Sequence, residues 1–170
     1  MTMIKNRIIE ILEKEVGTDA LPFISGTIDN PGTDECKLSE GRGSVYGIAI
    51  KITSKEEKIA LFNCKDAEIK GIDDWKSIGD DYYPLYWGKD INMGARLHSH
   101  TKASKSTGTC QLNSRKELEN KDIIYGAMPC SNYKKIEDRL HKKYPCIYKT
   151  RKSADKEELS IENLSIDENS

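Results

Sequence analysis

The spacing of apolar residues predicts a helix at the N-terminus. Four of them recur at the three- and four-residue intervals that place side chains on one face of a helix. These residues are Ile4, Ile8, Ile11 and Leu12. Thr2 is expected to cap this helix and Gly17 to end it. The stretch that follows, residues 18–43, is rich in Gly, Pro, Asp and Thr, and we expect it to be mostly loop.

Later segments have the composition of β-strands. Residues 44–52, SVYGIAIKI, are apolar nearly throughout, which favours a strand in the middle of its sheet. Further strands are predicted at residues 59–64, 82–87 and 122–128. A loop rich in Asp and Gly lies before residue 82.

Helical patterns return in the second half of the chain. The pattern of residues 91–100 predicts a short helix. Residues 101–109 are expected to form an exposed loop, and residues 112–120 are expected to form a further helical segment. A last helix is predicted from Asn132 until just before Pro145.

The order of these elements predicts a small α+β domain. Its central sheet is expected to be mainly antiparallel and flanked by helices. Residues 1–43 would form an N-terminal extension of helix and loop, and residues 44–152 the main domain. Residues 153–170 are acidic and poor in bulky side chains, which predicts a disordered tail.

Composition narrows the class of protein. The chain has 170 residues, of which 36% are hydrophobic and 32% charged, and this length suits one domain. No segment approaches the roughly 20 apolar residues of a membrane span, and no secretory signal is recognised. We therefore expect a cytoplasmic protein without a membrane partner. The five cysteines form no CxxC pair, which favours reduced thiols over a disulfide framework or a zinc site.

The net charge of −1 conceals an uneven distribution. Residues 84–152 carry 15 Lys and Arg against 6 Asp and Glu, whereas residues 1–83 carry 11 against 16. Residues 153–170 carry 1 basic residue against 6 acidic ones. A basic middle segment between acidic flanks suits binding to a polyanion. A solvated, lysine-rich surface is the alternative interpretation.

Reactive side chains gather in residues 83–100, YPLYWGKDINMGARLHSH. Arg96 and His100 are four positions apart, so they share one face of the helix predicted there. His98 and His100 form an HxH pair, which is a weak metal-binding signal because zinc needs three or four ligands. Tyr86 lies on the preceding strand, where a tyrosine often serves packing.

Taken in order, these residues resemble the motifs of GIY-YIG nucleases. The first motif of that family, a strand bearing a tyrosine, is similar to residues 44–48 with Tyr46, and the second is similar to Tyr86-Trp87-Gly88. Arg96 and His100 match the spacing of an arginine and a histidine on the family's next helix. A strand then precedes a helix that carries Glu137, the counterpart of the family's metal-binding glutamate. The resemblance covers about residues 44–150.

The resemblance implies a metal-dependent endonuclease that hydrolyses DNA phosphodiester bonds. Glu137 would hold Mg²⁺ or Mn²⁺ on a phosphate oxygen, and Tyr46 would act as general base on the attacking water. Tyr86 would orient the phosphate or the water, and Arg96 would stabilise the developing negative charge. His100 would accept the proton from Tyr46. Small members of this kind include type II restriction enzymes, which often form homodimers that place one site on each strand.

The basic middle segment would then contact the phosphates of DNA. The lysines expected to do so are Lys89, Lys102, Lys105, Lys134 and Lys135.

Two other functions stay open at the level of sequence. One is a non-catalytic nucleic-acid-binding or interaction module on the same fold, because residues around Tyr148 replace an asparagine that the family carries after the proline. The other is a metalloprotease of the JAMM type, which also uses an HxH pair. Gly108 and Gln111 stand where that family has a serine and an aspartate.

Overall fold

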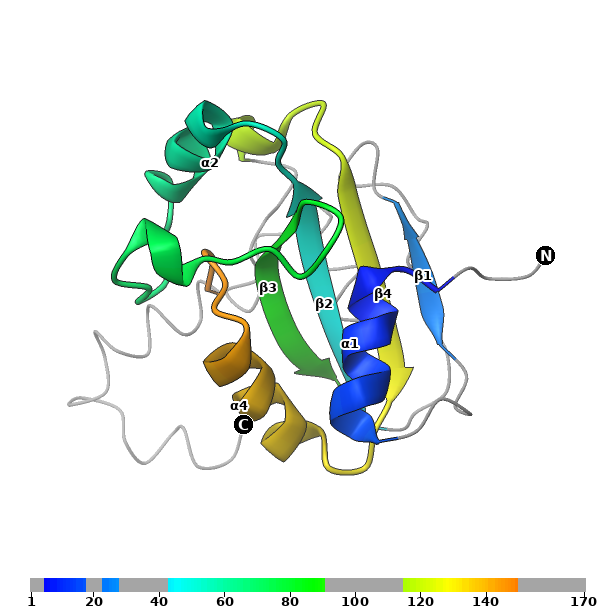
Figure 1. Cartoon of the computed structure of the whole chain (residues 1–170). Coiled ribbons are helices and arrows are strands. Elements are labelled where there is room, and N and C mark those ends of the chain that lie inside the picture. The colour runs from blue at the N-terminus through cyan, green and yellow to red at the C-terminus, as the bar shows by residue number, and fades with distance from the viewer. Residues whose placement is uncertain (1–4, 18–22, 28–42, 91–114, 150–170) are drawn as a thin grey trace.

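Four antiparallel strands form a sheet in the order β1-β4-β2-β3 (Figure 1). They are β1 (Ile24–Thr27), β2 (Ser44–Lys51), β3 (Tyr82–Asp90) and β4 (Ile123–Pro129). This computed structural model describes residues 5–17, 23–27, 43–90 and 115–149. Within those ranges the sheet is accompanied by three α-helices, namely α1 (Arg7–Val16), α2 (Lys55–Phe62) and α4 (Tyr133–Lys143). The fold is α+β with an antiparallel sheet, as the sequence predicted.

β2 lies in the interior of the sheet, where it pairs with β3 on one side and with β4 on the other. Its residues from Ser44 to Ile50 are all buried, which confirms the central strand that the apolar run predicted. The observed bounds of β2, β3 and β4 differ from the predicted strands by a few residues only.

α1 begins one turn later than the sequence predicted. Asn6, and not Thr2, caps the helix, because the side-chain oxygen of Asn6 accepts a hydrogen bond from the N–H of Ile9 at 3.1 Å. The side-chain amide of Asn6 also donates to the carbonyl of Tyr125 on β4 at 2.9 Å. Gly17 ends the helix as predicted, with a left-handed φ of 90°.

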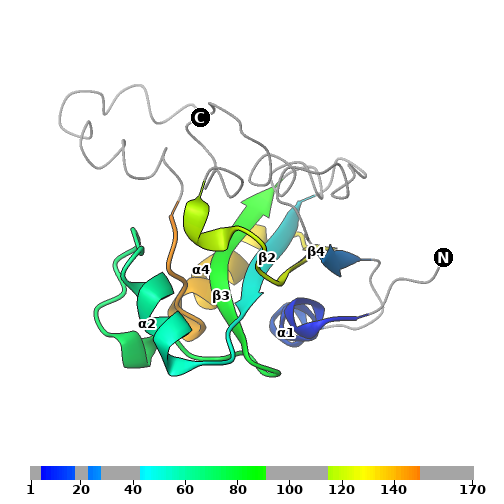
Figure 2. The same cartoon turned by 90° about the horizontal axis from the view of Figure 1, so that it is seen from above.

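α1 and α4 share one layer of side chains with the sheet. α1 contacts β4 and β2, α4 contacts β3, and the two helices also contact each other (Figure 2). Gly126 of β4 lets α1 approach the sheet closely, since a Cβ there would lie 2.8 Å from Ile9 and 2.9 Å from Ile8. The buried residues of this layer include Leu12, Val45, Ala49, Trp87, Met128, Ile136 and Leu140.

Alternate residues of β2 face the opposite side of the sheet. Tyr46, Ile48 and Ile50 belong to a second buried cluster there. This cluster is completed by side chains from outside the sheet, among them Leu61, Trp75, Leu118, Ile147 and Tyr148. Both faces of β2 are therefore covered.

The prediction of a strand at residues 59–64 is wrong, because these residues belong to α2 and the turn after it. Ser54 caps α2 by accepting a hydrogen bond from the N–H of Glu57 at 3.1 Å. Glu56 and Glu57 occupy the first turn, where negative charge stabilises a helix. The apolar run is too short to distinguish the two structures, and only Leu61 of the helix is buried.

Two other segments also differ from the prediction. Residues 24–27, expected to be part of a loop, form β1 and pair with residues 124–127 of β4. Of the helical segment predicted at residues 112–120, the described part holds only the 3-10 turn Lys116–Leu118. Arg115 and Glu119 on either side of that turn have extended backbones, which prevents a longer helix.

The predicted helix at residues 91–100, the loop at 101–109 and the acidic tail at 153–170 lie outside the described residues. Among the helices that are described, none has the length and apolar character needed to cross a membrane. Cys64, Cys130 and Cys146 are free thiols.

Candidate active site

The pairing of β2 with β3 brings the two tyrosine motifs together. Tyr46 lies opposite Gly88, and Ile48 lies opposite Tyr86. The rings of Tyr46 and Tyr86 are consequently neighbours, with centroids 6.2 Å apart and planes inclined by 43°. Tyr46 is only 1% exposed, whereas Tyr86 is half-buried. Two tyrosines far apart in the sequence thus form one aromatic pair near the edge of the sheet.

Trp87 fixes α4 against β3. Its indole ring covers Gly47, where no space remains for a Cβ. The indole N–H donates to the carbonyl of Tyr144, just after α4, at 2.8 Å. The rings of Trp87 and Tyr144 are also in contact, with centroids 5.9 Å apart. The tryptophan of the second tyrosine motif therefore determines where the end of α4 lies.

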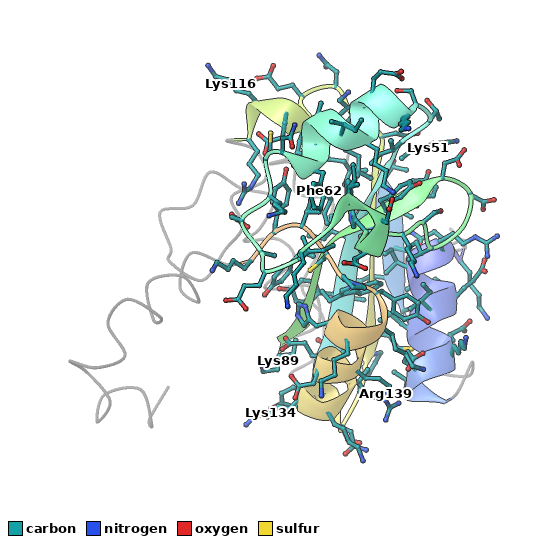
Figure 3. The ribbon with its side chains drawn as sticks, turned by 60° about the vertical axis from the view of Figure 1, so that its left-hand side comes forward. Lys51, Phe62, Lys89, Lys116, Lys134 and Arg139 are labelled. Carbon is teal, nitrogen blue, oxygen red and sulfur yellow. The ribbon has the colours of Figure 1, made fainter. Side chains whose placement is uncertain are left out.

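α4 presents a carboxylate to the end of β3. The Glu137 side chain is 14% exposed, and its Oε1 accepts a hydrogen bond from Nζ of Lys89 at 3.2 Å. Lys89 belongs to β3 and is 40% exposed. Figure 3 shows Lys89 beside α4, on the same side of the molecule as Lys134. Lys134 and Lys135, both expected to contact DNA, are exposed at the start of α4.

His141 lies one helical turn after Glu137 and contacts the tyrosine pair. Its ring meets the ring of Tyr86 edge-on, with centroids 5.9 Å apart. Burial lowers the pKa of His141 below its ordinary 6.5, although Glu137 and a hydrogen bond with the backbone of Trp87 act in the opposite direction. The imidazole is therefore neutral at neutral pH, and burial disfavours its protonated form.

We call the residues Tyr46, Tyr86, Lys89, Glu137 and His141 the β3-edge cluster. Tyr46, Tyr86 and Glu137 were predicted from the sequence as catalytic residues. Tyr86 contacts both Tyr46 and His141. Tyr46, however, belongs to the buried cluster on one face of β2, whereas the buried residues of α4 belong to the cluster on the other face. His141 itself was missed. Its spacing of four residues from Glu137, which puts both side chains on one face of α4, is the signal that could have found it. Arg96, His100, Lys102 and Lys105 lie outside the described residues.

Cys146 lies next to His141 but cannot serve as a nucleophile. Its Sγ is 3.7 Å from Nδ1 of His141. Burial raises the pKa of the Cys146 thiol to about 12, so the thiol stays protonated and unreactive.

Glu137 is the group of the cluster that suits a hard divalent cation. Mg²⁺ in phosphoryl-transfer sites is commonly held by one or two carboxylates together with waters and substrate phosphates, and one carboxylate meets that requirement. Lys89 binds Oε1 of Glu137 and would have to be displaced. Across the described ranges no group of three or more His, Cys, Asp or Glu side chains could hold a metal ion. A metal here would therefore depend on water and phosphate for its other ligands.

A cleft of about 640 Å³ adjoins the cluster. One side is formed by residues 67–70 with Asp74 and Lys76, and the other by the end of α4 and the residues that follow it. His141 lines this cleft as well as contacting Tyr86. Charged residues dominate the lining, with five lysines against two acids; they are Lys70, Lys76, Lys142, Lys143, Lys149, Glu68 and Asp74.

Tyr148 belongs to a separate network that stabilises the fold. Its hydroxyl donates to Oε2 of Glu117 at 2.7 Å, and the guanidinium of Arg115 lies over its ring, 3.8 Å from the centroid. Burial, together with the hydrogen bond to Glu117, raises the pKa of Tyr148. This tyrosine stays protonated and joins the segment before β4 to the segment after α4.

No protein-family model matches this chain, and comparison with curated proteins and with solved structures gave no significant match.

Proposed function

We propose that this protein is a metal-dependent endonuclease that hydrolyses phosphodiester bonds in DNA. One observation carries the proposal: the rings of Tyr46 and Tyr86, from two motifs far apart in the sequence, are neighbours at 6.2 Å. Many GIY-YIG nucleases, which the sequence resembles, hold their two tyrosine motifs side by side on a hairpin. Glu137 follows on the helix after β4, which is the position of the metal-binding glutamate in that family.

In the proposed mechanism, Tyr46 is the general base and Tyr86 orients the attacking water or the phosphate. A tyrosine pKa near 10 in water makes the phenol a weak base at neutral pH, so cationic neighbours must favour the phenolate. His100 was the expected acceptor for the proton. His141 contacts Tyr86 and not Tyr46, and burial lowers its pKa, so its role in the proposed mechanism is to position the Tyr86 ring.

Glu137 would hold Mg²⁺ or Mn²⁺, and the ion, when bound, would supply Lewis-acid polarisation of a phosphate oxygen. Arg96 would place its planar donor fork against the charge that develops on the phosphate. A type II restriction enzyme is the specific form we propose. A homodimer of such an enzyme would bring one site to each strand.

The test is incubation of the purified protein with plasmid DNA in Mg²⁺ or Mn²⁺, followed by mapping of the cut ends. Glu137→Ala should lower the cleavage rate by at least about a hundredfold while leaving the thermal melt close to that of the parent. Glu56→Ala, a matched change at an exposed position of α2, should cut normally. Equal cleavage by the Glu137 variant and the parent would reject the assignment.

The ion pair between Lys89 and Glu137 favours one alternative. If the ammonium of Lys89 stayed bound to the carboxylate of Glu137, no metal could bind there. The protein would then be a non-catalytic module that binds nucleic acid. Salt-dependent DNA binding without any cleavage in Mg²⁺ or Mn²⁺ would support this second function.

A further inference from the structure

We propose that the cleft between residues 67–76 and the end of α4 binds the phosphate backbone of the DNA substrate next to the β3-edge cluster. The assignment of DNA as the ligand rests on the proposed function. Binding in the cleft can nevertheless be measured without any cleavage, so the two proposals can fail separately.

An excess of positive charge is the first argument. Lys70, Lys76 and Lys142 are exposed on the cleft, and within the described part of the chain they make no ion pair or hydrogen bond. Lys143 differs, because its Nζ lies 3.1 Å from Oε2 of Glu15. Glu68 and Asp74 also line the cleft, so its five lysines exceed its acids by three. A concave surface with an excess of positive charge raises the local concentration of anions.

The convergence of two distant segments is the second argument. Lysines in the last turn of a helix are commonly explained by the negative end of the helix dipole, and this accounts for Lys142 on its own. It does not account for Lys70 and Lys76, which come from the segment between α2 and β3 and face the same cleft. Cations gathered from both sides of a cleft indicate a ligand.

Continuity with the β3-edge cluster is the third argument. His141 belongs both to the cleft and to the contact with Tyr86. Glu137 and His141 are four residues apart on α4, so their side chains lie on one face of the helix. A DNA backbone that enters the cleft beside His141 would therefore pass close to the proposed metal ligand.

The experiment compares two triple variants with equal loss of charge. Lys70→Ala/Lys76→Ala/Lys142→Ala removes the unpaired lysines of the cleft. The control, Lys14→Ala/Lys51→Ala/Lys55→Ala, removes three lysines that do not line the cleft; Lys51 lies far from Lys89 and Lys134 in Figure 3. Binding to fluorescein-labelled duplex DNA is measured by anisotropy in EDTA, where cleavage is suppressed, over a range of salt concentrations.

We expect the cleft variant to bind DNA at least tenfold more weakly at ~0.1 M salt, and its salt-dependence slope to fall by about 2–3, the value for three lost phosphate contacts. The control should keep most of its affinity. Lys70→Arg/Lys76→Arg/Lys142→Arg should restore the slope, which guards against a folding defect in the alanine variant.

Equal binding by the cleft variant and the control would overturn this inference, and so would absence of DNA binding by the parent. Binding of polyglutamate with the same dependence on these lysines would also overturn it, because the site would then recognise any polyanion. If the parent cuts DNA in a Glu137-dependent manner but the cleft lysines are dispensable, the proposed function stands and the cleft assignment fails. If the lysines are needed for DNA binding but the parent cuts no DNA, the cleft assignment stands and the proposed function fails.

Discussion

The ring of Tyr46 lies directly against Gly88 of the neighbouring strand. A Cβ at position 88 would overlap Cζ and Oη of Tyr46 and would lie 2.7 Å from its Cε1. Because Tyr46 is 1% exposed, its ring cannot move aside without disturbing the buried cluster around it. The glycine of the second tyrosine motif is therefore what allows the tyrosine of the first to occupy its position.

Gly88→Ala should consequently damage both stability and the site. We expect the free energy of unfolding to fall by about 1–3 kcal/mol, the usual cost of overpacking a core, and DNA cleavage to fall more than tenfold as Tyr46 shifts. Urea denaturation and plasmid cleavage measure the two effects. Gly71→Ala is the matched control, since a Cβ there would meet only Oδ2 of Asp74 at an ordinary 3.5 Å. Identical behaviour of the two variants would contradict the prediction.

Lys89→Gln should strengthen metal binding at Glu137. The ammonium and a divalent cation compete for the same carboxylate, and a partly exposed ion pair contributes roughly 0.4–1 kcal/mol, or a factor of about two to five. The Mn²⁺ concentration that gives half-maximal cleavage of plasmid DNA should fall by this factor, because the DNA phosphate supplies further ligands for the ion. Lys121→Gln breaks a comparable ion pair with Glu57 elsewhere and should leave this Mn²⁺ concentration unchanged. The prediction fails if both variants need the same Mn²⁺ concentration as the parent.

His141 should make the fold less stable in acid. Its pKa is lowered in the folded state from the ordinary 6.5, so as pH falls below 6.5 the unfolded chain takes up the proton first. Folding stability is then lost, by at most about 1.4 kcal/mol per pH unit. His141→Gln lacks this group, so the stability of the parent relative to the variant should decrease between about pH 7.5 and pH 5. Urea denaturation at several pH values tests this, and parallel profiles would disprove it.

Glu15 of α1 should contribute to stability through α4. Its side chain is 2% exposed and accepts hydrogen bonds from Lys143 Nζ at 3.1 Å and from the Tyr144 hydroxyl at 3.3 Å. Figure 3 shows Arg139, its other ionic neighbour at 3.7 Å, directed from α4 toward α1. Glu15→Gln should lower the free energy of unfolding by about 1–3 kcal/mol.

Glu10→Gln is the comparison for this change, because the carboxylate of Glu10 is 50% exposed in its ion pair with Arg7. Its effect should be clearly smaller when both variants are unfolded in urea. If the two changes cost the same, the buried position of Glu15 has no special importance.

Elements with a long, regular pattern could be predicted from the sequence. The apolar stripe of α1, the continuous apolar run of β2 and the spacing of Ile136 and Leu140 in α4 each specify one structure over many residues. The segment of α2 was predicted as a strand because its four apolar residues are compatible with one. Ser54, which caps the helix, and the acidic first turn favour the helix instead. β1 has no hydrophobic pattern, and only its backbone pairing with β4 defines it.

The candidate site was predictable only in part. The order of the motifs indicated Tyr46, Tyr86 and Glu137. No local sequence pattern predicts the register between β2 and β3 that makes the rings of Tyr46 and Tyr86 neighbours. His141 gains its significance from Tyr86, a residue on another element. The cleft depends on how residues 67–76 fold against the end of α4, and such long-range packing leaves no local signature in the chain.

The close seating of α1 on Gly126 has a practical consequence for anyone who prepares shortened forms of this protein. A chain that starts at residue 44 would lack the helix that covers Val45, Ala49 and Met128, and it would also leave Lys143 and Arg139 without Glu15. Apolar surface uncovered in this way is an aggregation hazard. Affinity tags are therefore better placed ahead of the first helix than used to replace it.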